Sequence, residues 1–201
     1  MIKAICFDLD GVYFSENGFK SFKQKIIDMG ADTEKVKYYL HGEPMLEFKR
    51  GTTKEQEYWQ NAVEYLELKI SPEKLVNLLP LGYEINQEVH GTVLKVRKNG
   101  YKTCICSNNF ETRVRLLDEK FDFIKNFDVP IFSYEVGVIK PDKKIFEILV
   151  ESAEVLPKEL IYSDDSEMAL QGAKEVGINA FVYEGFDKFK NKLIELGVKL
   201  D

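Results

Sequence analysis

Two aspartates near the amino terminus have a spacing suited to metal-ion or phosphoryl chemistry. Asp8 and Asp10 follow the apolar residues 2–7, and Gly11 comes directly after them. Alternate side chains of an extended segment lie on the same side, so both carboxylates point one way and Leu9 the other. Two carboxylates this close repel each other unless a cation or a shared proton compensates. Gly11 permits the tight turn that must follow. The pattern predicts a functional acidic site rather than a solvated strand end.

A second acidic pair follows another apolar run. Asp164 and Asp165 come after residues 160–162, and Ser166 begins the next expected helix. One aspartate at this position is explained as a helix N-cap. Two adjacent aspartates also supply the hard oxygen ligands that Mg²⁺ prefers.

Ser107, Asn108 and Lys140 are candidates for binding an anion. Ser107 ends an apolar run, and its hydroxyl with the free amides of a strand-to-helix turn suits a phosphate oxygen. Ordinary turn chemistry explains Ser107-Asn108 equally well. Lys140 precedes Pro141 and a predicted helix, where a lysine can neutralise a phosphate and a carboxylate together, although a solvated surface lysine is the default.

The elements that must position these residues alternate between strands and helices. Five apolar runs are too short for helices and lie near turn signals. They predict buried strands at residues 2–7, 102–106, 129–132, 160–162 and 179–183. Helical patterns lie between them. We therefore expect an α/β fold with a doubly wound, Rossmann-like parallel sheet, whose strands bring the candidate residues to their carboxyl edge.

Between the first two predicted strands, the sequence has helical patterns alone. Residues 19–29, 34–40, 54–68 and 73–79 have helical patterns, with turns at Gly30, Gly42 and Ser71-Pro72. We predict a core made of residues 1–14 and 83–201 and an inserted helical cap at residues 15–82. Specificity is expected in the cap, where Lys49, Arg50 and Glu16 are pocket candidates, although simple surface exposure also explains each.

Taken together and in this order, the motifs resemble those of the haloacid dehalogenase (HAD) superfamily. Asp8-Leu9-Asp10-Gly11 matches its first motif, Ser107-Asn108 the second, Lys140-Pro141 the third, and Asp164-Asp165 the fourth. The helical insert resembles the C1-type cap of subclass I. Gly51-Thr52-Thr53 is similar to the cap segment of the smaller sugar-phosphate phosphatases in this superfamily.

The resemblance implies a Mg²⁺-dependent phosphatase acting on a small-metabolite phosphomonoester, such as a sugar phosphate or a nucleotide monophosphate. Asp8 would attack phosphorus and form an aspartyl-phosphate, and Asp10 would be the general acid and base. The resemblance assigns Mg²⁺ to the Asp8 carboxylate, the Asp10 carbonyl and Asp165, with help from Asp164. It assigns the phosphoryl oxygens to Ser107, Asn108 and Lys140.

Several alternatives stay open at this stage. A phosphomutase of the same fold would transfer the phosphoryl group to another substrate hydroxyl instead of water. A catalytically weak or silent phosphate-binding protein is the second alternative, because Ala169 stands where the superfamily usually has a carboxylate or amide. Asp10 argues against dehalogenation, since a halide leaving group needs no proton. A response-regulator receiver is disfavoured by the late adjacent Asp pair and the large insert.

Composition narrows the class of partner. The chain of 201 residues has 28 basic and 34 acidic side chains and a net charge of −6. Such a surface repels phosphate backbones, so nucleic acid is not expected as a partner. No apolar run approaches the length of a transmembrane helix, and the three cysteines lie in strand-like runs. We expect a cytoplasmic protein that acts on a small phosphorylated metabolite, without a membrane partner; the oligomeric state is not indicated.

Overall fold

A single parallel sheet forms the centre of the molecule, whose computed structural model describes residues 1–15 and 17–200. The strand order is β3-β2-β1-β4-β5, and every neighbouring pair is parallel. The strands are β1 (Ala4–Phe7), β2 (Lys102–Ser107), β3 (Val129–Phe132), β4 (Leu160–Asp164) and β5 (Asn179–Val182). The predicted α/β fold with a doubly wound parallel sheet is confirmed, and each of the five predicted strands exists.

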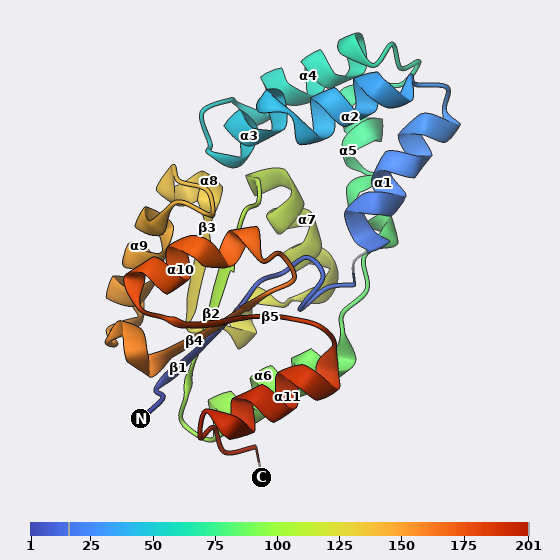
Figure 1. Cartoon of the computed structure of the whole chain (residues 1–201). Helices are drawn as coiled ribbons and strands as arrows, with labels where there is room; N and C mark the ends of the chain where they lie inside the picture. Colours follow the sequence, from blue (N-terminus) through green and yellow to red (C-terminus); the bar gives the residue numbers. More distant parts are fainter. Residues whose placement is uncertain (16, 201) are drawn as a thin grey trace.

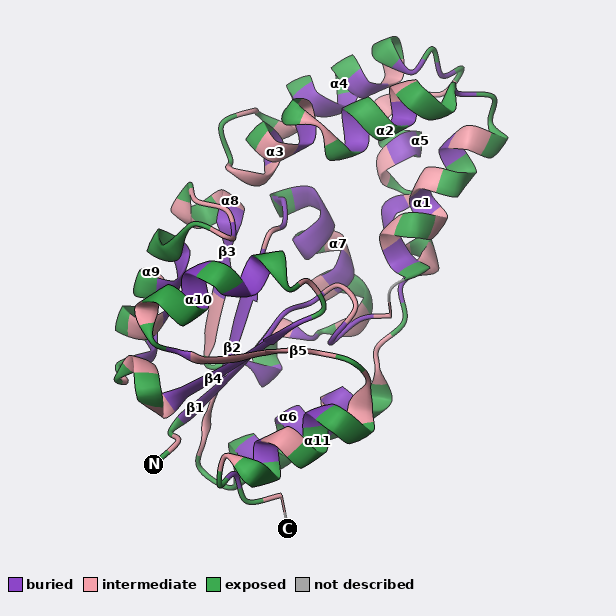
Figure 2. Ribbon diagram, viewed as in Figure 1, coloured by how far each residue is buried: buried purple, intermediate pink, exposed green. Residues whose placement is uncertain are grey.

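Helices cover both faces of the sheet (Figure 1). They are α6 (Gln87–Lys98), α7 (Glu111–Phe121), α8 (Ser133–Val136), α9 (Lys143–Ala153), α10 (Gln171–Val176) and α11 (Phe186–Glu195). Ile5 and Phe7 of β1 pack in one apolar cluster with residues of α6, α7 and α11. Ala4 and Cys6 pack in another cluster with residues of α9 and α10. Alternate side chains of β1 therefore pack against the helices on opposite faces of the sheet, and β1 is buried at every position (Figure 2).

Residues 17–82, hereafter the helical insert, contain α1 (Asn17–Asp28), α2 (Thr33–His41), α3 (Glu43–Lys49), α4 (Glu55–Tyr65), α5 (Pro72–Val76) and the short 3₁₀ helix η1 (Leu79–Gly82). The insert has an apolar cluster of its own, which is built largely on aromatic rings such as those of Phe22, Tyr58 and Trp59. It lies beyond one edge of the sheet (Figure 1).

One helix of the insert is absent from the sequence-based prediction. The expected turn at Gly42 exists as a single bend residue, which is both the C-cap of α2 and the N-cap of α3, so the missed element is the helix that follows it. Pro44 falls in the first turn of α3, where a proline costs no hydrogen bond because that N–H has no intrahelical partner. The Gly-x-Pro sequence therefore marks a junction between two helices rather than a loop.

The insert is joined to the sheet domain through the beginning of α7. Phe110, which precedes α7, is fully buried and belongs to the cluster of the insert. Its ring stacks on Phe48 of α3 with centroids 4.9 Å apart. The indole N–H of Trp59 also donates to the Thr112 hydroxyl over 3.2 Å. These contacts fix α3 above the carboxyl end of β2.

A second junction connects the end of α3 with α8. The buried Ser133 hydroxyl donates to the Lys49 carbonyl oxygen over 2.7 Å and accepts from the Asn109 N–H over 2.9 Å. Gly51, two residues after Lys49, has φ +73°. It lies so close to the Tyr134 carbonyl that an added Cβ would be 2.3 Å from that oxygen. Glycine is required here both for its backbone angle and for the close approach.

None of the helices in the described part of the chain has both the length and the apolar character that crossing a membrane demands.

The glycine junction predicts a difference between two alanine substitutions in the insert. Gly51→Ala meets the Tyr134 carbonyl, whereas Gly30→Ala, at φ +98°, meets no atom within 4 Å. Both pay roughly 1–2 kcal/mol for a left-handed alanine. We expect Gly51→Ala to lower the free energy of unfolding by roughly 1–3 kcal/mol more than Gly30→Ala, because the collision adds to the backbone strain. Urea denaturation of both variants measures the difference, and equal losses would show that the α3–α8 junction contributes nothing.

Candidate active site

Three neighbouring strands deliver the predicted site residues to one edge of the sheet. Asp8 comes one residue after β1, Ser107 is the last residue of β2, and Asp164 is the last residue of β4. Because β1 lies between β2 and β4, and all three run parallel, their carboxyl ends meet. This edge is where open α/β sheets form their ligand sites.

A buried lysine connects the two acidic motifs. Lys140 Nζ lies 2.8 Å from Asp8 Oδ1 and 2.6 Å from Asp164 Oδ2, and all three side chains are almost fully buried. The ammonium also donates to the Tyr162 hydroxyl over 2.8 Å and to the Cys106 carbonyl over 3.0 Å. The ammonium has more acceptors than protons, as a buried cation requires.

Tyr162 is a member of this cluster that sequence analysis missed. Its hydroxyl contacts the Asp164 carboxylate as well as Lys140, and its ring packs on Phe146. Tyr162 lies two residues before Asp164 on β4, so the two side chains emerge on the same face. That period is the signal that identifies it.

Burial and the shared lysine set the protonation of the carboxylates. Burial, reinforced by the nearby Asp164 and Asp10, raises the pKa of Asp8 to about 7, although Lys140 opposes this shift. Burial also acts upward on Asp164, but Lys140 and hydrogen bonds from Tyr162 and the Ser166 amide outweigh it and hold its pKa below the ordinary value. For Lys140, the two carboxylates outweigh burial and raise its pKa. Of these three groups, Asp8 is therefore the one whose pKa lies near neutrality in the absence of a metal.

Three carboxylates at this edge of the sheet form a set that suits a divalent cation. One oxygen each from Asp8, Asp164 and Asp165 lie within 4.8 Å of one another. Asp165 Oδ2 fills the space where a Cβ on Gly11 would lie, 2.3 Å away, and Gly11 has φ +77°. The glycine after the first acidic motif thus admits the carboxylate of the fourth. An all-oxygen set of this kind fits Mg²⁺.

Ala169 offers no ligand to this set. It lies in the short helix η4 (Met168–Leu170) and is buried with an apolar side chain. The acidic set therefore consists of side chains from the first and fourth motifs alone, as far as the described residues show.

Asp10, the other carboxylate of the first motif, has a different partner. Arg113 Nη2 lies 2.8 Å from Asp10 Oδ2, and the arginine side chain is 1% exposed whereas that of Asp10 is 39% exposed. The carboxylate is therefore accessible from the open side of the site while its charge is balanced from beneath. Asp8 and Asp10 thus lie in different electrostatic surroundings, although they are two residues apart.

Arg113 is held rigidly by its own neighbours. Its Nε donates to Asn109 Oδ1 over 2.6 Å and its Nη1 donates to the Tyr83 hydroxyl over 3.0 Å. The guanidinium lies 5.0 Å from the Phe110 ring centroid and 5.1 Å from that of Phe19. Cation–π contacts of this kind compensate for lost hydration.

Sequence analysis also missed Arg113, although the sequence carries a signal for it. Residues 110, 113, 114 and 117 follow the i, i+3, i+4, i+7 spacing of a buried helix stripe. Three of these positions are apolar, and the fourth is Arg113. A charged residue on a buried stripe requires a partner of opposite charge, which here is the partly exposed Asp10.

Asn108 uses its side chain to hold the loop that carries Lys140. Its Nδ2 donates to the Lys140 carbonyl over 2.9 Å, and its Oδ1 accepts from the Lys140 N–H over 2.7 Å. This reciprocal pair fixes the second motif against the third. Ser107 is 2% exposed at the end of β2, beside this loop.

The three pocket candidates of the insert have different positions. Lys49 is partly buried at the end of α3 and lies in the electrostatic field of Asp8 and Asp10. Arg50 forms an ion pair with Glu43 over 3.0 Å on the surface of the insert. Glu16 lies outside the described residues.

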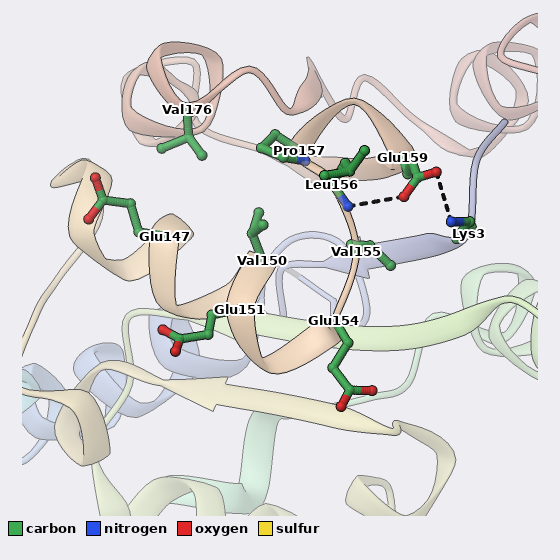
Figure 3. Close-up of a pocket in the computed structure, with 10 residues that line it drawn as sticks. All are labelled: Lys3, Glu147, Val150, Glu151, Glu154, Val155, Leu156, Pro157, Glu159 and Val176. Atoms are coloured by element: carbon green, nitrogen blue, oxygen red, sulfur yellow. Dashed lines mark hydrogen bonds and ion pairs between the residues drawn. The ribbon is translucent and has the colours of Figure 1, made fainter.

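A separate hollow lies at the opposite end of the sheet. It has a volume of about 620 Å³ and is bounded by Lys3, before β1, and by residues around α9 and α10 (Figure 3). Glutamates line it, and Glu159 forms an ion pair with Lys3 over 2.9 Å. Since β1 begins at this end and Asp8 follows its other end, the hollow is remote from the predicted site residues. Its acidic lining disfavours a phosphorylated ligand.

The sequence matches the haloacid dehalogenase-like hydrolases over residues 2–177. The chain belongs to this family of hydrolases. The D-ribitol-5-phosphate phosphatase of Bacteroides thetaiotaomicron is 24% identical over 208 residues, which cover 96% of this chain and 97% of that protein. The bifunctional epoxide hydrolase 2 of Mus musculus is 30% identical over 98 residues, and these cover 47% of this chain but 18% of that protein.

Solved structures share the whole architecture. A HAD family enzyme from Bacteroides thetaiotaomicron, in complex with magnesium and inorganic phosphate, superposes with a TM-score of 0.81 at 23% identity, covering 94% of this chain and 99% of that chain. The expectation of a HAD-type hydrolase is confirmed by the family match and the shared fold. The expected cofactor, Mg²⁺, agrees with the all-oxygen set of Asp8, Asp164 and Asp165.

The buried lysine predicts a pH-dependent loss of stability. Lys140→Met leaves the carboxylates of Asp8 and Asp164 buried without a cation, which costs about 3–5 kcal/mol at pH 8. Without the lysine, the pKa of Asp8 rises further above its wild-type value of about 7, so that at pH 5 this carboxyl is protonated and the repulsion is relieved. We therefore expect the deficit relative to wild type to shrink as the pH falls from 8 to 5.

Urea denaturation at the two pH values, without added Mg²⁺, tests this. Lys37→Met, at an exposed position of α2, is the matched control and should show a small deficit independent of pH. A deficit of Lys140→Met that grows on acidification would contradict the assignment.

Proposed function

We propose that this protein is a Mg²⁺-dependent phosphatase that hydrolyses a small-metabolite phosphomonoester through an aspartyl-phosphate on Asp8. The observation that supports it most directly is the buried Lys140, which lies between the Asp8 and Asp164 carboxylates beside an oxygen set suited to Mg²⁺. The phosphatase relative of nearly equal length is consistent with this activity.

Asp8 is the proposed nucleophile because of its position and its charge partners. It lies at the centre of the sheet edge, and one oxygen is fixed 2.8 Å from Lys140 Nζ. Attack requires the ionised carboxylate, and Lys140 opposes the rise of its pKa that burial causes. Attack of a carboxylate oxygen on phosphorus forms the acyl phosphate and releases the alcohol, which divides one difficult displacement into two easier ones.

Asp10 is the proposed general acid and base. Its carboxylate is partly exposed at the open side of the site, where the leaving oxygen and later the attacking water would lie. It would protonate the departing alcohol and then accept a proton from the water that hydrolyses the acyl phosphate. Arg113 lies on the opposite side of this carboxylate and fixes its orientation.

The remaining motif residues would hold the transferring phosphoryl group. Lys140, the Ser107 hydroxyl and the backbone N–H of Asn108 would donate hydrogen bonds to the phosphoryl oxygens. These donors would stabilise the transition state electrostatically. Asp8, Asp164, Asp165 and the Asp10 carbonyl would hold Mg²⁺, which supplies a positive charge that neutralises the phosphoryl oxygens.

Residues 15–82 are proposed to act as a cap over this site, with residues 1–14 and 83–201 as the core. The contacts of Phe48 with Phe110 and of Lys49 with Ser133 support this, since they hold the insert against the carboxyl edge of the sheet. A cap excludes water from the first step and provides contacts to the leaving group.

The decisive experiment measures inorganic phosphate released from sugar phosphates, nucleotide monophosphates and p-nitrophenyl phosphate, with and without Mg²⁺. We expect release that requires Mg²⁺ and that falls by at least about 10³-fold in Asp8→Asn, because an amide is not a nucleophile here. Release that persists in Asp8→Asn would contradict the mechanism. Isomerisation of a sugar phosphate without free phosphate would instead identify a mutase.

The pair of Asp10 and Arg113 predicts a dependence on the leaving group. p-Nitrophenolate leaves without a proton, whereas the alkoxide released from glycerol 3-phosphate must be protonated as it leaves. In Asp10→Asn, kcat/KM should therefore fall by roughly 10²–10⁴-fold more for glycerol 3-phosphate than for p-nitrophenyl phosphate. Arg113→Met should show the same trend at about a tenth of the size, since it disorders Asp10 without removing it.

The ratio of the two substrates separates positioning from a general loss of structure. If Arg113 serves folding alone, both substrates lose activity in equal proportion. Arg113→Lys retains the charge but not the donors to Asn109 and Tyr83, and should give an intermediate ratio.

A further inference from the structure

The cation that the phosphoryl chemistry leaves unused is Lys49. Among the described residues, the ion pairs around the site join Lys140 to Asp8 and Asp164, and Arg113 to Asp10, and none uses Lys49. A partly buried ammonium without a carboxylate partner is an unfavourable arrangement in a protein that has no ligand to bind.

The backbone around Lys49 is held firmly in place. Its carbonyl accepts from the buried Ser133 hydroxyl, and Gly51 packs directly on the Tyr134 carbonyl. On the other side, the Phe48 ring stacks on Phe110, whose ring also contacts the Arg113 guanidinium. The end of α3 is therefore fixed both to α8 and to the support of Asp10.

The contacts of its neighbours place Lys49 beside the support of Asp10. Phe48, the preceding residue, stacks on Phe110, whose ring lies against the Arg113 guanidinium that pairs with Asp10. The Ser133 hydroxyl that donates to the Lys49 carbonyl also accepts from the Asn109 N–H, at the start of the segment that carries Arg113. Burial, and then the nearby Arg113 charge, lower the pKa of Lys49 to about 8, although Asp10 and Asp8 oppose this shift, which agrees with such a position. Lys49 therefore lies on the Asp10 side of the site, where the alcohol part of the substrate is proposed to lie.

We propose that Lys49 forms a subsite for a second anionic group on the substrate, so that the preferred phosphomonoesters carry a carboxylate or a second phosphate on the leaving group. An anion there would supply the partner that Lys49 lacks. It would also lie near Arg113, whose own charge is already balanced by Asp10. This inference rests on the proposed function, because it assigns the substrate class of that same site.

A matched pair of substrates tests the subsite in the wild-type protein. 3-Phosphoglycerate and glycerol 3-phosphate share a three-carbon skeleton and differ in a carboxylate against a neutral hydroxymethyl group. We expect kcat/KM to favour 3-phosphoglycerate by about tenfold to a hundredfold, the range for one hydrogen-bonded charge pair. Fructose 1,6-bisphosphate against fructose 6-phosphate gives the corresponding comparison for a second phosphate, and the larger of the two ratios identifies the anionic group.

Lys49→Met should reduce the preferred ratio to about one, and Lys54→Met, an exposed lysine of the same segment, should leave it unchanged. Removal of an unpaired buried charge should leave the melting temperature of Lys49→Met equal to or above that of wild type, a result that a structural role would not give. A Lys49→Met variant that retains the wild-type ratio would overturn the proposal.

The pH dependence provides a second readout. The charged groups that affect the pKa of Lys49 are Arg113, Asp10, Asp8 and Lys140 from the sheet domain, and burial, Lys23 and Lys49 in turn lower the pKa of the titratable His41 of α2. Because an anion binds the protonated amine, the wild-type ratio should decrease between pH 7 and pH 9.5, and in Lys49→Met it should not.

Binding to Asp8→Asn separates this inference from the proposed function. Calorimetry with Mg²⁺ and the same ligands measures affinity without turnover. One outcome is that 3-phosphoglycerate or the bisphosphate binds Asp8→Asn about tenfold more weakly when Lys49→Met is added, while the wild-type protein releases no phosphate. That outcome would support the subsite and reject the phosphatase. Asp8-dependent phosphate release without any preference for a second anion would support the phosphatase and reject the subsite.

Discussion

The burial of one ammonium group, that of Lys140, constrains the whole carboxyl edge of the sheet. A lysine shielded from water must be surrounded by acceptors, and its acceptors come from three strands and two motifs: Asp8 after β1, Cys106 on β2, and Tyr162 and Asp164 on β4. These groups converge because β1 lies between β2 and β4. A different strand order would leave the lysine or the carboxylates uncompensated, at a cost of several kcal/mol. The sheet topology and the site are thus one constraint.

A second buried cation extends this logic to the helical insert. Arg113 balances Asp10, but its own surroundings combine Asn109 and Tyr83 with the ring of Phe19 from α1. Helices α1 and α7 therefore meet at the guanidinium that orients Asp10. The position of the insert and the orientation of the proposed acid and base are coupled through this contact, so that a movement of the insert is expected to affect the chemistry as well as access to it.

Local charge and total charge act differently in this protein. The chain carries a net charge of −6, and the hollow at the amino end of the sheet is lined with glutamates. At the carboxyl end, in contrast, the buried cations Lys140 and Arg113 pair with Asp8, Asp164 and Asp10. With the charge of a divalent cation added, these local cations would balance the local carboxylates, so that the proposed phosphorylated anion could bind at this edge while distant charges are screened by salt.

The five strands, the helical insert and the candidate motifs could be predicted from the sequence, because apolar periodicity and turn residues are local properties. The sequence also predicted that Asp8, Asp164 and Lys140 belong to one edge of the sheet. Local patterns place Tyr162 on the same face as Asp164 and put Arg113 on a buried stripe, but they do not name the partners. The contacts of Tyr162 with Lys140 and of Arg113 with Asp10 join residues that lie far apart in the chain, so only the folded structure defines them. Helix α3 is a further case, since only a turn at Gly42 is predicted locally, whereas in the folded chain residues 43–49 form a helix whose Phe48 packs on Phe110.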